Sequence, residues 1–326
     1  MHLLGIDGGQ TSTKSCLYDR ENGSCLIASG PPIDHMLTLD GQIRSKQGIQ
    51  QSVRTLLGRT ANPPQTVDMA FVSISGVHRE HEDMIKDWIQ ECIRVERVAV
   101  EGDVKANLAG ASGGRNDGVV IIGGGGSIGY YCDGENEYVA GGYGHILGDE
   151  GSAYWIGLQA IKAGIRYGNG LGPKTVLYGR ILDHFGEASY WGVKKQVHAG
   201  NIHRGDIAGL AVLVETAANE GDAVAQSVLR QAGSELGQLA VSVLTQMAGS
   251  PRASRVRKVY PTGGVFQSAL WVRRSLEEML RAYDPAVEIC DPQYPPIIGA
   301  LILAAQALAT EIHLPAMDRA LQGGEA

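Results

Sequence analysis

The pattern of apolar and polar positions along the chain predicts an α/β protein. Short apolar runs that end in glycine or acidic turns are typical of strands, and longer mixed stretches are typical of helices. In the first part of the chain, strands are expected near residues 3–7, 15–20, 68–74 and 97–101, and helices near 45–58 and 81–93. In the second part, strands are expected near 118–122, 128–132 and 256–260, with helices starting at 151, filling much of 205–248, and covering 267–282 and 297–310.

This repeated order of strands and helices predicts two α/β domains with a cleft between them. At 326 residues the chain is long enough for two domains with substantial cores. We place the boundary near 110–118, which gives an N-terminal domain of residues 1–114 and a C-terminal domain of residues 115–326. The last helix is expected to pack back onto the first domain.

Three glycine turns interrupt the apolar runs. The first lies in Gly5–Lys14, where the strand ends in Asp7-Gly8-Gly9 before hydroxyl residues that include Thr11. Such a turn offers backbone N–H groups without side-chain bulk, which suits a phosphate chain. Asp7 puts a carboxylate at the end of the first strand, in a position to hold Mg²⁺ directly or through water.

The second turn repeats this arrangement in Val119–Tyr131, where an apolar strand runs into four glycines and Ser127. Two such hairpins indicate a duplicated architecture that grips one nucleotide from both sides, although two unrelated hairpins of an α/β protein would give the same pattern. The third turn, Val259–Phe266, leads into a helical stretch from Gln267 and offers a flat backbone surface suited to a base or ribose.

Composition narrows the classes of partner. The formal net charge of −7 argues against nucleic acid or an anionic membrane as a partner, but it is compatible with ATP held by backbone N–H groups and Mg²⁺.

The five cysteines show no metal-binding spacing, and their odd number favours a reducing compartment. The first residues already form a strand, and the longest apolar run, 297–309, is too short to span a bilayer. We therefore expect a cytoplasmic protein.

Two acidic segments are candidates for chemistry. Asp103 follows a short strand and precedes a helical pattern, so it is either a carboxylate facing the cleft or the N-cap of the next helix, and its spacing fits both equally. In residues 141–155, glycines flank Tyr143 before Asp149 and Glu150. This loop can press Tyr143 against an apolar ligand face while Asp149 takes ligand hydroxyls. The alternative is a glycine-rich hairpin with both acids as helix-dipole partners, which we favour for Glu150.

With these pieces together, the chain resembles the N-acetylglucosamine kinase branch of the actin/hexokinase-type ATPases, which is grouped with the benzoyl-CoA reductase activator ATPases. The resemblance covers roughly residues 3–310, and its most specific match is Gly-Gly-Tyr-Gly-His-Ile-Leu-Gly-Asp-Glu-Gly-Ser-Ala-Tyr-Trp-Ile at 141–156. Further support comes from Ile207–Leu210, from Gly221-Asp222 and from the helix around Gly233 and Gly237. The resemblance implies two ribonuclease H-like domains, ATP and Mg²⁺ as cofactors, and a homodimer.

The resemblance also implies roles for individual residues. It makes Asp103 the catalytic base and Asp7 a ligand of Mg²⁺. The nucleotide and its phosphates would be bound by Thr11, Gly124, Gly125, Gly126, Ser127, Ala208, Gly264 and Ser268. The sugar would be bound by Asp34, Gly142, Tyr143, Gly144 and Asp149.

Three positions depart from the pattern of the animal enzymes. Tyr143 stands in place of a tryptophan, which keeps an aromatic stacking surface. Gly125 replaces a threonine, so one side-chain contact to phosphate is absent and the backbone must suffice. Asp34 replaces an asparagine, which bears on the choice of sugar and leaves the reaction class as it is.

Together these features predict an ATP-dependent kinase for the primary hydroxyl of an amino sugar. The first choice is N-acetylglucosamine, giving N-acetylglucosamine 6-phosphate, and glucosamine and N-acetylmuramic acid are alternatives. A second possibility is an ATPase that activates a partner reductase or dehydratase. Cys132 is the only cysteine between the second glycine turn and the 141–156 loop, which weighs against the shared iron–sulfur cluster of such activators. A third possibility is a regulator that binds ATP or sugar without turnover, which would not need a base such as Asp103.

Overall fold

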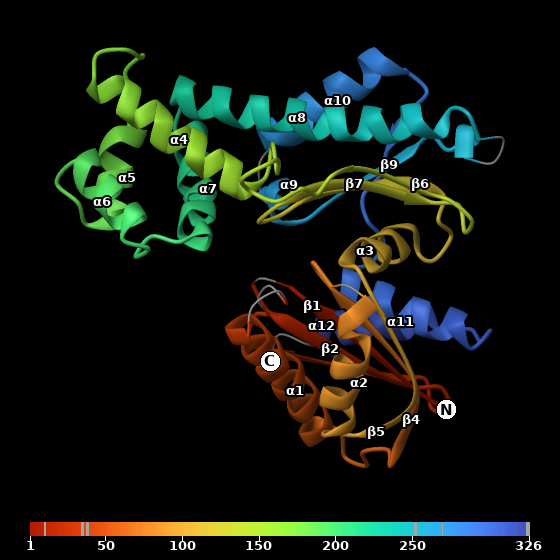
Figure 1. Cartoon of the computed structure of the whole chain (residues 1–326). Helices are drawn as coiled ribbons and strands as arrows, with labels where there is room; N and C mark the ends of the chain where they lie inside the picture. The colour runs from red at the N-terminus through yellow and green to blue at the C-terminus, as the bar shows by residue number, and fades with distance from the viewer. Residues whose placement is uncertain are drawn as a thin grey trace. The chain divides into compact units, whose positions relative to one another are not determined.

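The computed structural model of the chain divides into two compact units (Figure 1). The first unit is Met1–Asn116 together with Pro292–Ala326, and the second is Asp117–Asp291. The structure describes residues 1–9, 11–33, 36, 39–77, 79–250, 253–268 and 270–323. Within these residues each unit contains one five-stranded mixed sheet with helices packed on it, which confirms the expected two-domain α/β fold.

The sheet of the first unit brings the carboxyl ends of three parallel strands next to one another. Its order is β3-β2-β1-β4-β5, in which β1, β4 and β5 are parallel and β2 is antiparallel to both β1 and β3. The strands are β1 (His2–Gly8), β2 (Thr13–Asp19), β3 (Ser24–Gly30), β4 (Thr66–Ile74) and β5 (Arg94–Glu101). Asp7 of β1 is in register with Ser73 of β4, and Ser73 is in register with Glu101 of β5. The carboxyl ends of these three strands therefore lie side by side.

Helices cover both faces of this sheet. They are α1 (Leu39–Arg59), α2 (Glu82–Gln90), α3 (Asp103–Ser112), α11 (Pro296–Ala307) and α12 (Leu314–Gly323), with the 3₁₀ turn η1 (Arg79–His81) before α2. One core cluster joins the sheet to α1 and α2 and contains Ile6 and Val72, while another joins it to α11 and contains Leu3 and Phe71. Successive residues of a strand point to opposite faces, so the continuous apolar runs of β1 and β4 reflect burial on both faces.

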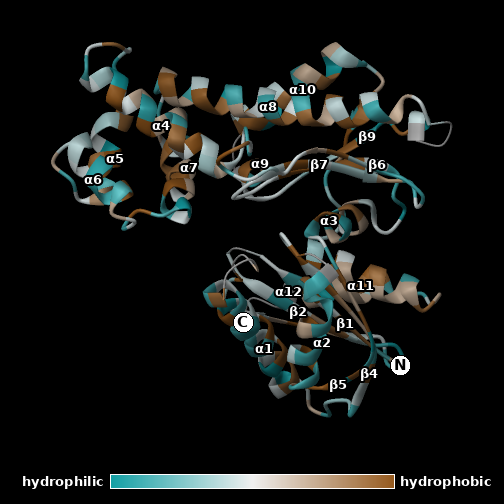
Figure 2. Ribbon diagram, viewed as in Figure 1, coloured by the Kyte–Doolittle hydropathy of each residue, from teal (hydrophilic) through white to brown (hydrophobic). Residues whose placement is uncertain are grey.

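Helix α11 follows the second unit in sequence but packs in the first unit. It is enclosed between the sheet and α3, and apolar residues, brown in Figure 2, run along it. Glycines allow the close approach of the backbones. A Cβ atom on Gly299 would lie 1.9 Å from the carbonyl oxygen of Ala106, and one on Gly5 of β1 would lie 3.1 Å from that of Ile297. No helix in the described part of the chain is long and apolar enough to cross a membrane.

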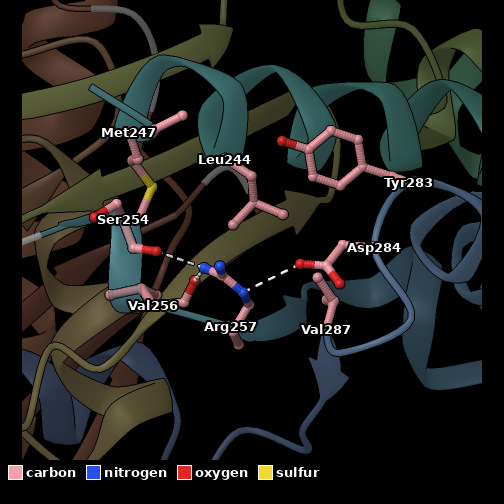
Figure 3. A pocket seen from close by; sticks show the side chains of 9 residues that line it. Leu244, Met247, Ser254, Val256, Arg257, Tyr283, Asp284 and Val287 are labelled. Atoms are coloured by element: carbon pink, nitrogen blue, oxygen red, sulfur yellow. Dashed lines mark hydrogen bonds and ion pairs between the residues drawn. The ribbon is translucent and has the colours of Figure 1, made fainter. Parts of the chain in front are cut away.

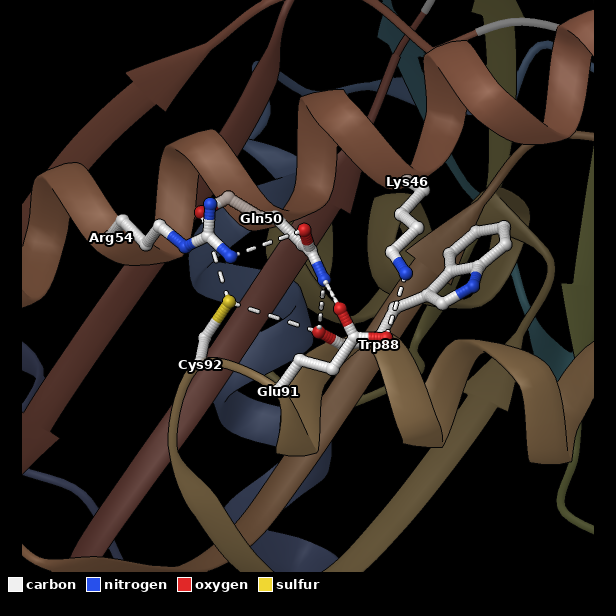
Figure 4. A network of polar contacts seen from close by, with 6 residues as sticks. All are labelled: Lys46, Gln50, Arg54, Trp88, Glu91 and Cys92. Carbon is white, nitrogen blue, oxygen red and sulfur yellow. Dashed lines mark hydrogen bonds and ion pairs between the residues drawn. The ribbon is translucent and has the colours of Figure 1, made fainter.

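A polar network joins α1 to α2 in the first unit (Figure 4). The amide of Gln50 donates to the carbonyl oxygen of Trp88 at 3.0 Å and to Glu91 Oε2 at 2.8 Å, and Lys46 Nζ pairs with Glu91 Oε1 at 2.7 Å. The hydrogen bonds from Lys46 and then from Gln50 lower the pKa of Glu91. Because Gln50 is buried, its bonds hold the two helices in place, whereas the exposed ion pair adds little.

The second unit repeats the strand arrangement of the first. Its sheet order is β10-β9-β6-β7-β8, in which β6, β9 and β10 are parallel and β7 is antiparallel to both β6 and β8. The strands are β6 (Gly118–Gly123), β7 (Ser127–Cys132), β8 (Glu137–Gly141), β9 (Lys258–Thr262) and β10 (Glu288–Ile289). Each unit thus contains the same meander followed by parallel strands, which matches the duplicated architecture expected from the first two glycine turns.

The helices of the second unit build a large apolar core on its sheet. They are α4 (Ala153–Gly168), α5 (Leu177–Phe185), α6 (Tyr190–His198), α7 (Arg204–Asn219), α8 (Ala223–Met247), α9 (Gly264–Ser268) and α10 (Leu270–Tyr283), with the 3₁₀ turn η2 (Ala253–Arg255). The long helix α8 begins where the Asp222 side chain accepts the Ala225 N–H at 2.9 Å. It lies along α10 (Figure 1), and a Cβ on Gly233 would be 2.1 Å from the Val272 carbonyl oxygen, so glycine permits this contact.

The structure contains elements that the apolar pattern did not predict. These are β3, β8, β10, α5, α6 and α12. Strands β3 and β8 lie at sheet edges, carry several exposed residues and pair with β2 and β7, so their pattern is weak and their partners define them. The helix after the third glycine turn begins at Gly264, three residues before the expected Gln267, directly after Gly263 with its φ of 95°.

Candidate active site

The first glycine turn connects β1 to β2 in the first unit. Gly9 N–H donates to the Ser12 carbonyl oxygen at 3.1 Å, and the Gly9 carbonyl oxygen accepts from Ile33 N–H at 3.1 Å. Thr11 is exposed in this turn. The turn is therefore held by backbone hydrogen bonds while it presents a hydroxyl to solvent. The phosphate-binding role of Thr11 stays a prediction.

Asp7 lies near the carboxyl end of β1 and is half-buried. Its pKa is raised to about 7, first by burial of the carboxylate and second by the negative charge of Asp103, while Lys14 opposes the shift. Ser73, its register partner on β4, is fully buried, and its hydroxyl has no hydrogen-bond partner among the described residues. A cation bound at this carboxylate would relieve both the burial of charge and the repulsion from Asp103.

Asp103 is the first residue of α3 and follows the end of β5. Gly102 occupies the N-cap position, so Asp103 is not the N-cap residue. The Asp103 carboxylate accepts hydrogen bonds from the backbone N–H groups of Asp103 and Val104 and from the Ser75 hydroxyl. Burial outweighs these bonds and raises the pKa of Asp103 above its usual range. A half-buried carboxylate with a raised pKa beside a second acid has the properties of a general base.

The donor set of the first unit fits one mode of Mg²⁺ binding. In the described ranges, no three or more His, Cys, Asp and Glu side chains are grouped to hold a metal ion. Mg²⁺ usually keeps several waters and is bound through one or two carboxylates plus substrate phosphates. Asp7, with Asp103 near enough to shift its pKa, matches that requirement. Binding of Mg²⁺ by Asp7 stays a prediction.

The second glycine turn, Gly124–Ser127, joins β6 to β7 in the second unit. Gly124 N–H donates to the Gly126 carbonyl oxygen at 2.9 Å, and Ser127 Oγ donates to the Glu150 carbonyl oxygen at 2.7 Å. A Cβ atom on Gly124 would meet no described atom within 4 Å, so open space lies beside this backbone. The turn therefore has the room that close approach of a phosphate requires.

Asp149 contacts the second glycine turn in this structure. Its side chain is 4% exposed; Oδ1 accepts from Ser127 N–H at 3.2 Å, and Oδ2 pairs with Arg204 Nη2 at 3.1 Å. Its φ of 62° lies in the left-handed region, which is rare for residues other than glycine. Each carboxylate oxygen can accept a second hydrogen bond, so these contacts leave acceptor capacity for a ligand hydroxyl. Sugar binding by Asp149 stays a prediction.

The 141–151 loop joins β8 to α4 and is tied to the second glycine turn. Gly142 and Gly144 have φ values of 78° and 81°, and Gly142 N–H donates to the Ser127 carbonyl oxygen at 2.9 Å. The Tyr143 side chain between them is 74% exposed, so its ring is available for stacking. The loop thus presents an aromatic face from a backbone anchored at the turn.

The residues predicted to line the nucleotide lie on two helices of the second unit. Ala208 is half-buried on α7, and Gly264 is exposed at the start of α9, where an added Cβ would meet no described atom within 4 Å. Gly263 is different, because its φ is 95° and a Cβ there would lie 2.4 Å from the Gly123 carbonyl oxygen. Ser268 ends α9, and its side chain lies outside the described residues.

The candidate residues are divided between the two units. Asp7, Thr11 and Asp103 belong to the first unit, and the remaining described candidates belong to the second. The first unit brings Asp7 and Asp103 within electrostatic range, and the second brings Asp149 and Gly142 to Ser127. Asp34 lies outside the described residues.

Sequence reasoning missed three residues of these sites: Ser73, Ser75 and Arg204. Ser73 is the last residue but one of β4, and only the sheet register relates it to Asp7. Ser75 comes directly after β4, and only the fold brings it to Asp103. Arg204 pairs with a carboxylate 55 positions away. Its local signal is a basic residue at the start of a helix, which is too common to indicate a site.

A cavity of about 210 Å³ lies at the C-terminal end of α8 (Figure 3). It is lined by Leu244, Met247, Ala248, Ser254, Val256, Arg257, Tyr283, Asp284 and Val287. The Arg257 side chain is engaged there, because Nε pairs with Asp284 Oδ2 at 3.1 Å and Nη1 donates to the Ser254 carbonyl oxygen at 2.6 Å. None of the described candidate residues lines this cavity, so we assign it no part in the reaction.

Known proteins resemble this chain over nearly its whole length. It is 28% identical over 306 residues to the N-acetylmuramic acid/N-acetylglucosamine kinase of Clostridium acetobutylicum, covering 93% of this chain and 98% of that protein. It is 26% identical over 318 residues to the N-acetyl-D-glucosamine kinase of Dictyostelium discoideum, covering 93% and 97%.

Solved structures share the fold. One is a Chromobacterium violaceum protein provisionally described as an N-acetylglucosamine kinase, with a TM-score of 0.71, 24% identity and coverage of 93% of this chain and 98% of that chain. Another is the ROK family glucokinase of Streptomyces griseus in complex with glucose and AMPPNP, with a TM-score of 0.58, 17% identity and coverage of 94% and 100%. Residues 4–304 match a single family of ATPases, and the chain belongs to the BadF/BadG/BcrA/BcrD ATPase family.

Proposed function

We propose that this chain transfers the γ-phosphoryl group of ATP to the primary hydroxyl of an amino sugar, with N-acetylglucosamine as the preferred substrate. The observation that carries the proposal is the pair of Asp7 and Asp103 at the carboxyl edge of the first sheet, each with a raised pKa. The names of relatives that are 28% and 26% identical support an amino sugar as the substrate class. The chain is thus an ATP-dependent sugar kinase.

Asp103 supplies the base. It accepts the proton of the sugar hydroxyl while the hydroxyl oxygen forms a bond to the γ-phosphorus. The bond between this phosphorus and the bridging oxygen breaks, and ADP leaves with the electron pair. The raised pKa of Asp103 makes it a stronger base than an ordinary aspartate, and the bonds from Ser75 and the first turn of α3 fix its orientation.

The two glycine turns position the phosphates. Backbone N–H groups and hydroxyls of Thr11 and of Gly124–Ser127 hold the phosphate oxygens, and the open space beside Gly124 admits them. Asp7 would hold Mg²⁺, which would supply positive charge to neutralise the phosphates. Ala208, Gly264 and Ser268 line the nucleotide in this proposal.

The sugar is held by the 141–151 loop and by Asp34. Tyr143 stacks on the apolar face of the ring, Gly142 and Gly144 allow close approach, and Asp149 accepts from a hydroxyl. Asp34 either accepts from a ring hydroxyl, which leaves N-acetylglucosamine preferred, or attracts a 2-ammonium group, which favours glucosamine. We favour the first. The ratio of kcat/KM for glucosamine over N-acetylglucosamine should then be the same in wild type and Asp34→Asn, and a drop of about tenfold or more would indicate ammonium recognition.

A coupled ADP-release assay tests the function. Purified protein with ATP and Mg²⁺ is supplied with N-acetylglucosamine, N-acetylmuramic acid, glucosamine or glucose, and the product is identified by mass spectrometry. Sugar-dependent ADP release with a 6-phosphate product is expected, and Asp103→Asn serves as the inactive control. ADP release that no sugar accelerates would contradict the proposal.

The activator ATPase remains the alternative that this assay must exclude. An activator that shares an iron–sulfur cluster would be coloured as purified, and its ATP hydrolysis would not depend on sugar. We expect a colourless protein, because Cys132 ends β7 and no group of three or more His, Cys, Asp and Glu side chains among the described residues could hold a metal ion. A homodimer and a cytoplasmic location also stay predictions.

A further inference from the structure

We propose that Arg204 is a positioning residue that fixes the second glycine turn in its nucleotide-binding form and so sets the affinity for ATP. Arg204 is the first residue of α7, and its side chain is 20% exposed. The inference rests on the proposed function, in that the turn is taken to hold ATP phosphates. Its central measurement is ATP binding, which does not require that the sugar be known.

A single nitrogen of Arg204 bridges two segments. Nη2 donates to the Gly125 carbonyl oxygen at 2.9 Å and to Asp149 Oδ2 at 3.1 Å. In a trans peptide the carbonyl and the following N–H point in opposite directions. Because Arg204 holds the carbonyl oxygen of Gly125, it also orients the N–H of Gly126 away from itself. The direction of one amide of the second glycine turn is therefore set by a side chain from α7.

The same contact balances a buried charge. The Asp149 carboxylate is 4% exposed and lies against the turn, since its Oδ1 accepts from Ser127 N–H at 3.2 Å. A Cβ on Gly126 would lie 2.9 Å from that oxygen, so the carboxylate is packed directly against the turn backbone. An unpaired carboxylate there would repel the phosphates of ATP. Arg204 provides the compensating positive charge, and removal of one partner of a buried pair leaves the other uncompensated.

The bridge completes a set of bonds that join the turn to the 141–151 loop and to the start of α4. Gly142 N–H donates to the Ser127 carbonyl oxygen, and Ala153 N–H donates to the Gly124 carbonyl oxygen, each at 2.9 Å. Arg204 adds α7 to this set, and Ala208, the predicted nucleotide contact, lies one turn further along the same helix. Loss of the bridge should therefore disturb phosphate binding first and the sugar contacts of Tyr143 less.

Calorimetric titration with a non-hydrolysable ATP analogue and Mg²⁺ tests the inference. Wild type is compared with Arg204→Gln, Arg204→Lys and the control Arg180→Gln, which breaks an ion pair between α5 and Glu220 at the other end of α7. Arg204→Gln should weaken nucleotide binding by about tenfold or more. Arg204→Lys should recover part of the affinity, because one cationic nitrogen can make both contacts. Arg180→Gln should bind like wild type.

Two further readouts separate positioning from a general structural role. In steady-state assays, Arg204→Gln should raise the KM for ATP more than the KM for the sugar. Adding Asp149→Asn to Arg204→Gln removes the uncompensated charge and should restore part of the nucleotide affinity. Unchanged nucleotide affinity in Arg204→Gln would overturn the inference, as would a loss that parallels a fall in melting temperature and is not relieved by Asp149→Asn. Failure of every sugar in the kinase assay, with the nucleotide effect intact, would count against the proposed function alone.

Discussion

Replacing Asp7 with asparagine should make the stability of the metal-free protein less dependent on pH. In the folded chain the pKa of Asp7 is raised from its ordinary value of 3.8 to about 7. Between these values the folded state holds a proton that the unfolded state has already lost. The unfolding free energy of the wild type must therefore fall as the pH rises through this window. Asparagine has no proton to lose, so the variant lacks this fall.

The magnitude follows from the width of the window. Each pH unit between the two pKa values corresponds to about 1.4 kcal/mol of unfolding free energy. Between pH 5 and pH 8, a single group with these pKa values lowers the unfolding free energy of the wild type by about 2–3 kcal/mol. Asp7→Asn lacks this group, so its unfolding free energy does not fall for this reason. The physical cause is the burial of the Asp7 charge, followed by its repulsion from Asp103.

Urea unfolding followed by circular dichroism, in EDTA between about pH 5 and pH 8, measures this difference. The unfolding free energy of Asp7→Asn minus that of the wild type should grow by about 2–3 kcal/mol across the range. Asp87→Asn is the control, because it removes an exposed carboxylate from α2 of the same unit. Parallel curves for wild type and Asp7→Asn would refute the reasoning. At the upper pH, Mg²⁺ with ATP should stabilise the wild type more than Asp7→Asn.

Three further predictions concern catalysis and binding. Asp103→Asn should bind ATP and sugar nearly as tightly as the wild type, while its kcat falls about 10²–10⁴-fold. If the variant keeps more than a tenth of the wild-type kcat, Asp103 is not the base. Gly124→Ala should keep the wild-type melting temperature but raise the KM for ATP, because the added methyl group enters the open space proposed for phosphate. The control Gly263→Ala should instead lower the melting temperature. An unchanged KM for ATP in Gly124→Ala would contradict the phosphate role. Tyr143→Ala should raise the KM for sugar alone, and equal changes for both ligands would point to a role in folding.

The features that the sequence by itself determined are local ones. The glycine turns after β1 and β6, the acid at the end of β1 and the step from β5 into α3 each depend on a few neighbouring residues. Apolar runs and turn residues encode such features directly. The alternation of strands and helices was enough to predict the α/β class and, with the 141–156 motif, the family, and both were confirmed.

The tertiary structure decided what depends on residues far apart in the chain. The order β3-β2-β1-β4-β5 brings Asp7 and Asp103 together, and only that proximity, with burial, raises the pKa of Asp7 to about 7. The edge strands β3 and β8 exist because β2 and β7 offer them hydrogen bonds. Arg204 reaches Asp149 because α7 packs against α4, so its partner follows from packing. Strand pairing, burial and charge compensation depend on which distant segments pack together in the folded protein. A local pattern of residue types does not specify these long-range contacts.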